Sequence, residues 1–139
     1  MIYTNSDGGA RGNPGPGAIG VIVREDNNIL LEYTEKIPGK VTNNYAEYMA
    51  LIKALELVQK YTSKEVTCIM DSELVVRQLL GEYQVRDPKL EKLFLQVQEL
   101  QKNFEKINYQ HVRRKDKFQT HADYLLNKKL DENNKNIII

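Results

Sequence analysis

The sequence contains one cysteine, no tryptophan and no long hydrophobic run. The lone Cys68 cannot form an internal disulfide, and its place in the apolar run Val66–Met70 predicts a buried thiol. No apolar stretch approaches the roughly 20 residues that span a membrane, and the first residues lack the basic and apolar regions of a signal peptide. We therefore expect a cytoplasmic protein with no membrane partner.

An excess of charge of one sign is also absent, since 20 Lys and Arg residues face 19 Asp and Glu residues, for a net charge of +1. This balance argues against binding to nucleic acid through the overall field of the protein, so any such binding must depend on local geometry. Basic residues do gather at Arg113–Lys115, Lys117 and Lys128–Lys129. Short charge runs of this kind are typical of solvated surfaces.

With 139 residues, of which 41% are hydrophobic and 28% charged, the chain has the size and composition of one compact domain. We expect this domain to cover residues 1–132 and to be followed by a tail over residues 133–139. The tail is a polar spacer that ends in three isoleucines. We expect it to pack back on the domain, with a sheet edge or a partner as alternative docking sites.

The first third of the chain has the β-branched residues and turn signals of a meander of antiparallel strands. The predicted strands cover Ile2–Asp7, Ala18–Arg24 and Ile29–Ile37. A turn rich in Gly and Pro over Gly8–Gly17 separates the first two strands, and Pro38-Gly39 is expected to end the third.

The remainder alternates between helical and strand patterns. Helices are predicted over residues 44–61, 72–80, 88–100 and 119–130, and strands over 66–70 and 107–112. Asp71-Ser72 and Asp87-Pro88 supply helix starts. The order predicts an α/β fold: a mixed five-stranded sheet, with three antiparallel strands followed by parallel ones and helices on both faces.

Four acidic residues stand where a soluble domain does not usually place them. Asp7 ends the first strand, and Asp71 directly follows the central strand. Glu47 lies on the apolar stripe of the first long helix, and Asp123 lies early in the last helix. Carboxylates brought together repel one another unless a cation neutralises them, and ligand sets made only of oxygen favour magnesium or manganese.

Each acidic residue also has an ordinary structural interpretation when it is taken alone. Asp71 could cap a helix, and Asp7 could form a turn before glycine. Glu47 could be exposed if the apolar stripe runs along another side of the helix. Asp123 could interact favourably with the helix dipole near the start of its helix. The local sequences around the four residues are needed to choose between these interpretations.

Those local sequences form four motifs that together resemble the type 1 ribonuclease H family, over residues Tyr3 to about Leu130. The motifs are Thr4–Ala18 (TNSDGGARGNPGPGA), Thr42–Glu47 (TNNYAE), Met70–Ser72 (MDS) and Ala122–Leu125 (ADYL). The resemblance implies a ribonuclease H-like fold. It also implies that the family's four metal-binding catalytic carboxylates are Asp7, Glu47, Asp71 and Asp123.

The resemblance implies an endonuclease that hydrolyses the RNA strand of RNA/DNA hybrids by a two-metal-ion mechanism and leaves 5′-phosphate and 3′-hydroxyl ends. Mg²⁺ is the expected ion, with Mn²⁺ as a substitute and two ions per site when substrate is bound. No organic cofactor is expected, and the protein is expected to be a monomer. Double-stranded RNA is a second candidate substrate, because it also presents 2′-hydroxyls in a wide minor groove.

The same resemblance implies a set of substrate contacts. Along the minor groove these are Gly8, Ala10, Asn13, Asn43 and Asn44, which would contact 2′-hydroxyls and bases. Lys40 and Thr42 match positions that hold a phosphate of the DNA strand. Turn chemistry is the alternative interpretation of these polar residues.

The sequence departs from many members of the family at several places, including Gln119, where an Asn is common. The connection between Leu80 and Pro88 is short where relatives insert a basic helix and loop, and the loop over residues 113–119 has no histidine. Substrate contacts could therefore differ, and a module that holds hybrids without cutting them is the alternative function. Such a module would be expected to lack a carboxylate, and all four are present.

Overall fold

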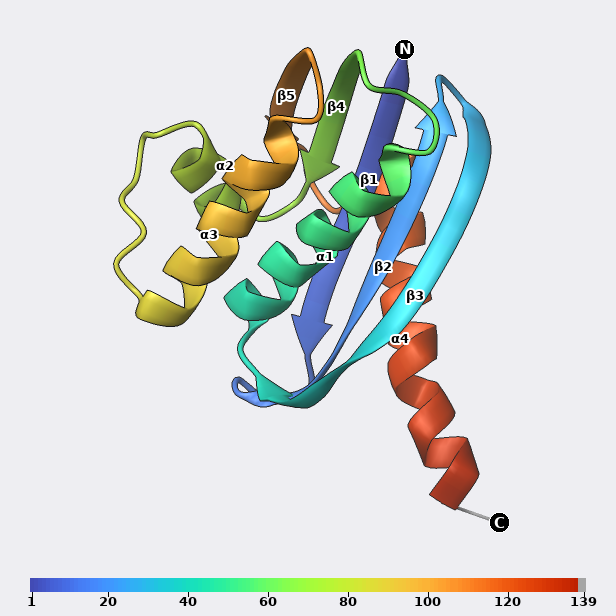
Figure 1. Ribbon diagram of the computed structural model, residues 1–139. Helices are drawn as coiled ribbons and strands as arrows, with labels where there is room; N and C mark the ends of the chain where they lie inside the picture. The colour runs from blue at the N-terminus through green and yellow to red at the C-terminus, as the bar shows by residue number, and fades with distance from the viewer. Residues whose placement is uncertain (138–139) are drawn as a thin grey trace.

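The computed structural model describes residues 1–137 and contains strands and helices in the predicted order (Figure 1). The strands are β1 (Ile2–Ala10), β2 (Gly15–Glu25), β3 (Asn28–Val41), β4 (Glu65–Met70) and β5 (Lys106–His111). The helices are α1 (Asn43–Val58), α2 (Glu73–Leu79), α3 (Pro88–Gln101) and α4 (Lys117–Ile137). Within the described residues, none of these helices has the length and hydropathy to cross a bilayer.

The strands form one mixed sheet in the order β3-β2-β1-β4-β5. The pairs β1–β2 and β2–β3 are antiparallel, whereas β1–β4 and β4–β5 are parallel. Helices α1, α2 and α3 cover one face, and α4 crosses the other face (Figure 1). The predicted fold class is confirmed.

The two faces of the sheet hold cores of very different size. On the α1 face, the apolar stripe of α1 packs into a large cluster with side chains of β2, β4, α2 and α3. The free Cys68 is buried there, as predicted, and burial raises the pKa of its thiol to about 12. On the α4 face the buried apolar cluster consists of Ala18, Leu126 and Leu130.

Two glycines allow the helices to approach the sheet on both sides of Asp7. A Cβ added to Gly8 would lie 2.1 Å from the carbonyl oxygen of Ala46 in α1. A Cβ added to Gly20, the cross-strand partner of Asp7, would lie 2.3 Å from the carbonyl oxygen of Ala122 in α4. Only a residue without a side chain permits this contact between backbones.

The prediction of a turn over the whole glycine-rich segment Gly8–Gly17 is wrong. β1 continues to Ala10 and β2 begins at Gly15, with Ala10 opposite Gly17 in the ladder. Gly8, Gly9, Gly15 and Gly17 therefore lie in strands, and the turn is confined to residues 11–14, where Gly12 has a φ of 97°.

The prediction that Pro38-Gly39 ends the third strand is also wrong, since β3 runs on to Val41. The register shifts between Pro16, opposite Lys40, and Gly17, opposite Ile37, so Pro38 and Gly39 form a bulge. Gly39 has a φ of 75°. A bulge tolerates proline because the missing N–H is not needed in the ladder.

Helix α4 begins earlier than predicted, at Lys117, where Asp116 Oδ1 accepts hydrogen bonds from the backbone N–H groups of Phe118 (3.1 Å) and Gln119 (3.0 Å). The expected boundary between residues 132 and 133 falls inside this helix. The expected docking of the tail concerns side chains of residues 133–139, which lie outside what the structure describes.

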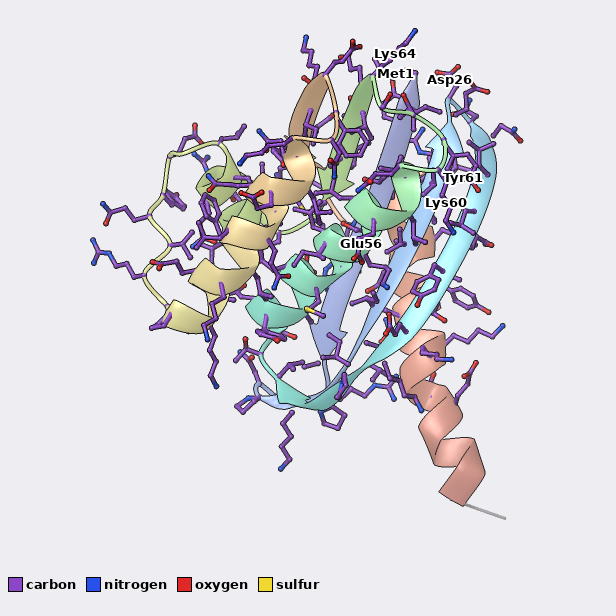
Figure 2. The ribbon with its side chains drawn as sticks, in the orientation of Figure 1. Met1, Asp26, Glu56, Lys60, Tyr61 and Lys64 are labelled. Carbon is purple, nitrogen blue, oxygen red and sulfur yellow. The ribbon has the colours of Figure 1, made fainter. Side chains whose placement is uncertain are left out.

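The two ends of the sheet differ in chemistry. Figure 2 shows Met1, Asp26 and Lys64 at the end where β1 begins, and there the N-terminal amine lies 3.7 Å from Asp26 Oδ1. Strands β1 and β4 finish and α1 begins toward the opposite end (Figure 1). The acidic motif residues Asp7, Glu47 and Asp71 come together near these strand ends. The candidate site therefore lies at the carboxyl ends of the two parallel strands, as expected in open sheets.

We predict that Gly20→Ala lowers the free energy of unfolding by roughly 1–3 kcal/mol, because the added methyl group forces α4 away from β2. Gly9→Ala is the matched control, since its Cβ would meet only Leu126 Cδ1, at 3.5 Å. Urea denaturation measures both variants. Equal stability of the two would contradict the proposed role of bare backbone at Gly20.

Candidate metal and nucleic-acid site

Three of the four motif carboxylates converge at one point. One carboxylate oxygen from each of Asp7, Glu47 and Asp71 lies within 4.8 Å of the others. β1 and β4 pair in parallel only as far as Asn5 and Ile69, so the residues that follow flank a gap between the strand ends. Asp7 is a ladder residue opposite Gly20, and its interpretation as a turn former is wrong.

Glu47 reaches this point from α1 and is buried, with 7% of its surface exposed. The backbone N–H of Gly8 donates to Glu47 Oε1 at 3.1 Å, whereas Oε2 is buried without a hydrogen-bond partner. The helical stripe that includes Glu47 is confirmed, and the alternative of an exposed helix residue is wrong.

Asp71 does not cap α2, because Ser72 is the N-cap residue and its Oγ accepts from the backbone N–H of Val75 at 3.3 Å. Asp71 Oδ2 is buried without a hydrogen bond and lies 3.5 Å from Arg114 Nε. The carboxylate of Asp71 is thus free of the capping role that its position in the sequence allowed.

Asp123 comes from the other face of the sheet, in the second turn of α4, and lines the same pocket as the three converging carboxylates. Its backbone carbonyl accepts from Asn127 Nδ2 at 2.9 Å. The backbone contact of Gly20 with Ala122 places this turn of α4 beside Asp7. All four motif carboxylates therefore face one pocket.

Burial and mutual repulsion disfavour the charged forms of these groups. Burial raises the pKa of Asp7 far above its ordinary value, and the charges of Glu47 and Asp71 raise it further. Burial also raises the pKa of Glu47. Burial raises the pKa of Asp71, although the Arg114 guanidinium opposes that rise. Such a cluster is relieved by a bound cation.

The donor set fits a hard divalent cation. The three clustered groups are all carboxylates, and two of their oxygens, Glu47 Oε2 and Asp71 Oδ2, are buried without a hydrogen-bond partner. Buried oxygens are almost always satisfied in folded proteins, so these two are candidates for metal ligands.

The pocket has a volume of about 500 Å³ and lies between the strand ends, the start of α1 and one side of α4. Its lining residues are Asp7, Gly8, Gly9, Ala10, Arg11, Asn43, Asn44, Glu47, Asp71, Ser72, Arg114, Asp123, Leu126, Asn127 and Leu130. Four of the seven expected substrate contacts line it: Gly8, Ala10, Asn43 and Asn44.

The other three expected contacts lie outside the lining. Asn13 touches the site indirectly, since its Oδ1 accepts from the backbone N–H of Asn43 at 3.0 Å. Thr42 caps α1 by accepting from the backbone N–H of Tyr45, and Lys40 is exposed on β3. Asn43 Oδ1 in turn accepts from the backbone N–H of Ala10 at 2.9 Å, so this N–H positions Asn43.

Arg114 is a site residue that the sequence pattern did not reveal, because it stands in a short basic run that resembles solvated surface. Its guanidinium is 85% exposed and faces Asp71 from the loop between β5 and α4. Arg11 was also missed, and its Nη2 lies 2.6 Å from Asp131 Oδ1. Arg114 stands shortly before the last acidic motif, and this position in the sequence could have indicated that it lies near the site.

Several known proteins are similar to this chain in sequence and in fold. A family model described as reverse transcriptase-like matches residues 5–128. The bifunctional protein Rv2228c of Mycobacterium tuberculosis is 40% identical over 131 residues, which cover 94% of this chain and 35% of that protein. Ribonuclease HI of Halobacterium salinarum is 39% identical over 132 residues, which cover 94% of this chain and 65% of that protein.

Among solved structures, LC11-RNase H1 in complex with an RNA/DNA hybrid superposes with a TM-score of 0.87 and 40% identity, over 95% of this chain and 98% of that chain. The fold and the sequence therefore place the protein among ribonuclease H-like proteins. Within that class, the chain belongs to the type 1 ribonuclease H family, in the form without a basic insertion between α2 and α3. It spans about a third of the mycobacterial relative and 65% of the halobacterial one.

We predict that Asp7→Asn stabilises the metal-free protein at pH 7 by roughly 1–3 kcal/mol, because a buried carboxyl group beside Glu47 and Asp71 must take up a proton to avoid its charge, and an amide need not. Since the pKa of Asp7 is raised, the folded state holds a proton that the unfolded state releases above about pH 4. The free energy of unfolding of the wild type should therefore fall as the pH rises from about 4 to 8.

The measurement is urea denaturation in chelator across that pH range. The gap between Asp7→Asn and wild type should widen as the pH rises, and added Mg²⁺ should stabilise the wild type more than the variant. Glu25→Gln is the control, because it removes an exposed carboxylate at the far end of β2. If Asp7→Asn is less stable than the wild type at pH 7 without metal, the carboxylate cluster does not destabilise the metal-free protein and the prediction is wrong.

Proposed function

We propose that this protein is a divalent-metal-dependent endonuclease that hydrolyses the RNA strand of RNA/DNA hybrids. The observation that carries the proposal is the convergence of Asp7, Glu47 and Asp71, with two buried oxygens that accept no hydrogen bond, in a pocket that Asp123 also lines. Family membership supports the substrate class, and the related LC11-RNase H1 has been solved with an RNA/DNA hybrid.

The four carboxylates would hold two Mg²⁺ ions, or Mn²⁺ in their place. The chemistry that such ions supply is activation of the attacking water and neutralisation of charge on the leaving 3′ oxygen, giving 5′-phosphate and 3′-hydroxyl ends. The protein's own part is positioning. The N–H of Gly8 holds Glu47, and the pairing of β1 with β2 at Gly20 holds Asp7.

The neutral polar groups beside the carboxylates would recognise the hybrid. Asn43 and Asn44 lie at the start of α1 on the pocket wall, and an amide can both donate to and accept from a 2′-hydroxyl. Asn13 supports Asn43 through the backbone hydrogen bond described above. Arg114 would bring positive charge next to Asp71, where a phosphate of the substrate could replace the contact with the carboxylate.

The proposed function is tested with end-labelled RNA/DNA hybrid, duplex RNA and duplex DNA of one sequence. With Mg²⁺, we expect cuts in the RNA strand of the hybrid, none in DNA, and slower cleavage of duplex RNA if it is a second substrate. Excess chelator should abolish all cleavage, because the empty carboxylate cluster only repels an incoming phosphate. Cleavage that persists in chelator would refute the metal dependence, and an intact hybrid with Mg²⁺ and Mn²⁺ would refute the proposed activity.

We predict that Asp71→Asn lowers the cleavage rate by about a thousandfold, roughly 4 kcal/mol, while folding is unchanged or slightly improved. The amide keeps the size of the carboxylate but offers one neutral oxygen. Because Ser72 and not Asp71 caps α2, the substitution leaves the helix start intact. Thermal unfolding without metal and hybrid cleavage with Mg²⁺ are measured on the same preparations.

Asp87→Asn is the matched control for this prediction. Asp87 caps α3, where its Oδ1 accepts from the backbone N–H groups of Lys89 at 2.8 Å and Leu90 at 3.4 Å. Asparagine caps a helix about as well, so both stability and cleavage should be kept. Near wild-type cleavage by Asp71→Asn would rule out a catalytic role for Asp71.

A further inference from the structure

A chain of buried polar side chains lies between the sheet and the first turns of α4. Arg24 Nε donates to Asn5 Oδ1 at 2.9 Å, and Asn5 Nδ2 donates to Gln119 Oε1 at 3.3 Å. Gln119 Nε2 then donates to the backbone carbonyl of Ser6 at 2.8 Å. Arg24 is 8% exposed, whereas Asn5 and Gln119 are fully buried.

This arrangement is unusual for a packing contact. Burying a cation and two amides is unfavourable unless their hydrogen bonds are made, and apolar side chains of similar size would fill the same space with no such requirement. Here the Arg24 guanidinium lies 4.3 Å from the ring centre of Tyr3 and 4.2 Å from that of Phe118. The bonds and rings fix the directions of these groups, which apolar packing would not do.

The hydrogen bonds of Gln119 join the strand that carries Asp7 to the helix that carries Asp123. Ser6, whose carbonyl accepts from Gln119, directly precedes Asp7 in β1. Gln119 stands four residues before Asp123 in α4, so the two side chains lie on one face of the helix, one turn apart. Gln119 therefore links the backbone that directly precedes Asp7 to the helical turn that precedes Asp123.

This part of α4 contacts the sheet through Gln119, through the backbone of Ala122 at Gly20, and through the exposed His121, whose Nε2 lies 2.6 Å from Glu32 Oε1. The buried apolar cluster on this face contains Ala18, Leu126 and Leu130, and both helix residues in it follow Asp123. Before Asp123, the buried residues of α4 are Phe118, Gln119 and Ala122, of which Gln119 makes directional bonds to the sheet.

We propose that Gln119 is a positioning residue, which Asn5 and Arg24 hold in place and which sets Asp123 at the correct distance from Asp7 for both to act on the same ions. This inference rests on the proposed function in its metal-dependent part. Its role is exerted through Asp123, because Gln119 is not among the pocket-lining residues.

The test compares Gln119→Met with Gln78→Met. Gln78 is a matched control, because it is 5% exposed and also makes one accepted and one donated bond, from Tyr48 Oη at 2.6 Å and to the carbonyl of Gln84 at 3.4 Å. It lies in α2, on the other face of the sheet, and does not line the pocket. Methionine keeps the volume and removes both bonds in each case.

Three quantities are measured for each variant: stability in chelator, the Mn²⁺ midpoint from thermal shift of the protein alone, and kcat and KM for hybrid cleavage at saturating metal. For Gln119→Met we expect a midpoint raised about tenfold and a kcat lowered about tenfold, with KM nearly unchanged. For Gln78→Met we expect a similar loss of stability, with the midpoint and kcat within about twofold of wild type.

A Gln119→Met variant that loses only stability, with the metal midpoint and kcat of wild type, would overturn the positioning role. If that variant does not fold, Gln119→Asn takes its place. Its shorter side chain keeps one of the two bonds, and it should raise the midpoint about threefold, whereas an unchanged midpoint again overturns the proposal. The metal titration uses no nucleic acid, so it separates failure of this inference from failure of the proposed activity, which wild-type cleavage tests.

Discussion

The site depends on one constraint: Asp7 lies next to Gly8 and opposite Gly20, two positions that can carry no side chain. Gly8 admits α1 on one face of the sheet, and Gly20, opposite Asp7 in the ladder, admits α4 on the other. A carboxylate from each helix can approach Asp7 because each helix contacts the strands backbone to backbone at one of these glycines. The geometry of the site thus follows from the absence of two Cβ atoms.

The two approaching helices are held by different forces. α1 carries an apolar stripe into the large cluster on its face, so burial of apolar surface fixes it along its length. α4 shares only a small apolar cluster with the sheet, and its first turns are bonded through Gln119 to Asn5 and to the carbonyl of Ser6. Hydrogen bonds therefore help to hold the start of α4 against the sheet, whereas apolar packing holds α1 against the other face.

Much of the fold could be predicted from the sequence, because the order of strands and helices follows from local periodicity. The carboxylates could be proposed because each stands at an element end or on an apolar stripe, within a motif. The extents of β1, β2 and β3 could not be predicted, since Gly8–Gly17 and Pro38-Gly39 are turn signals and only pairing with distant strands overrides them. The bond from Asn5 to Gln119 joins residues 114 positions apart, and no local pattern indicates it.

The distribution of charge in the pocket bears on how a nucleic acid would be selected. Both arginines that line it face acidic groups, Arg114 at Asp71 and Arg11 at Asp131, so the protein itself balances part of their positive charge. The wall beside the carboxylates instead presents the amides of Asn43 and Asn44. Amides distinguish a 2′-hydroxyl from a hydrogen atom, whereas a positive surface binds every phosphate backbone alike. A pocket built in this way would select its substrate by the hydroxyl groups of the RNA strand, and the near-neutral chain agrees with such a mode of recognition.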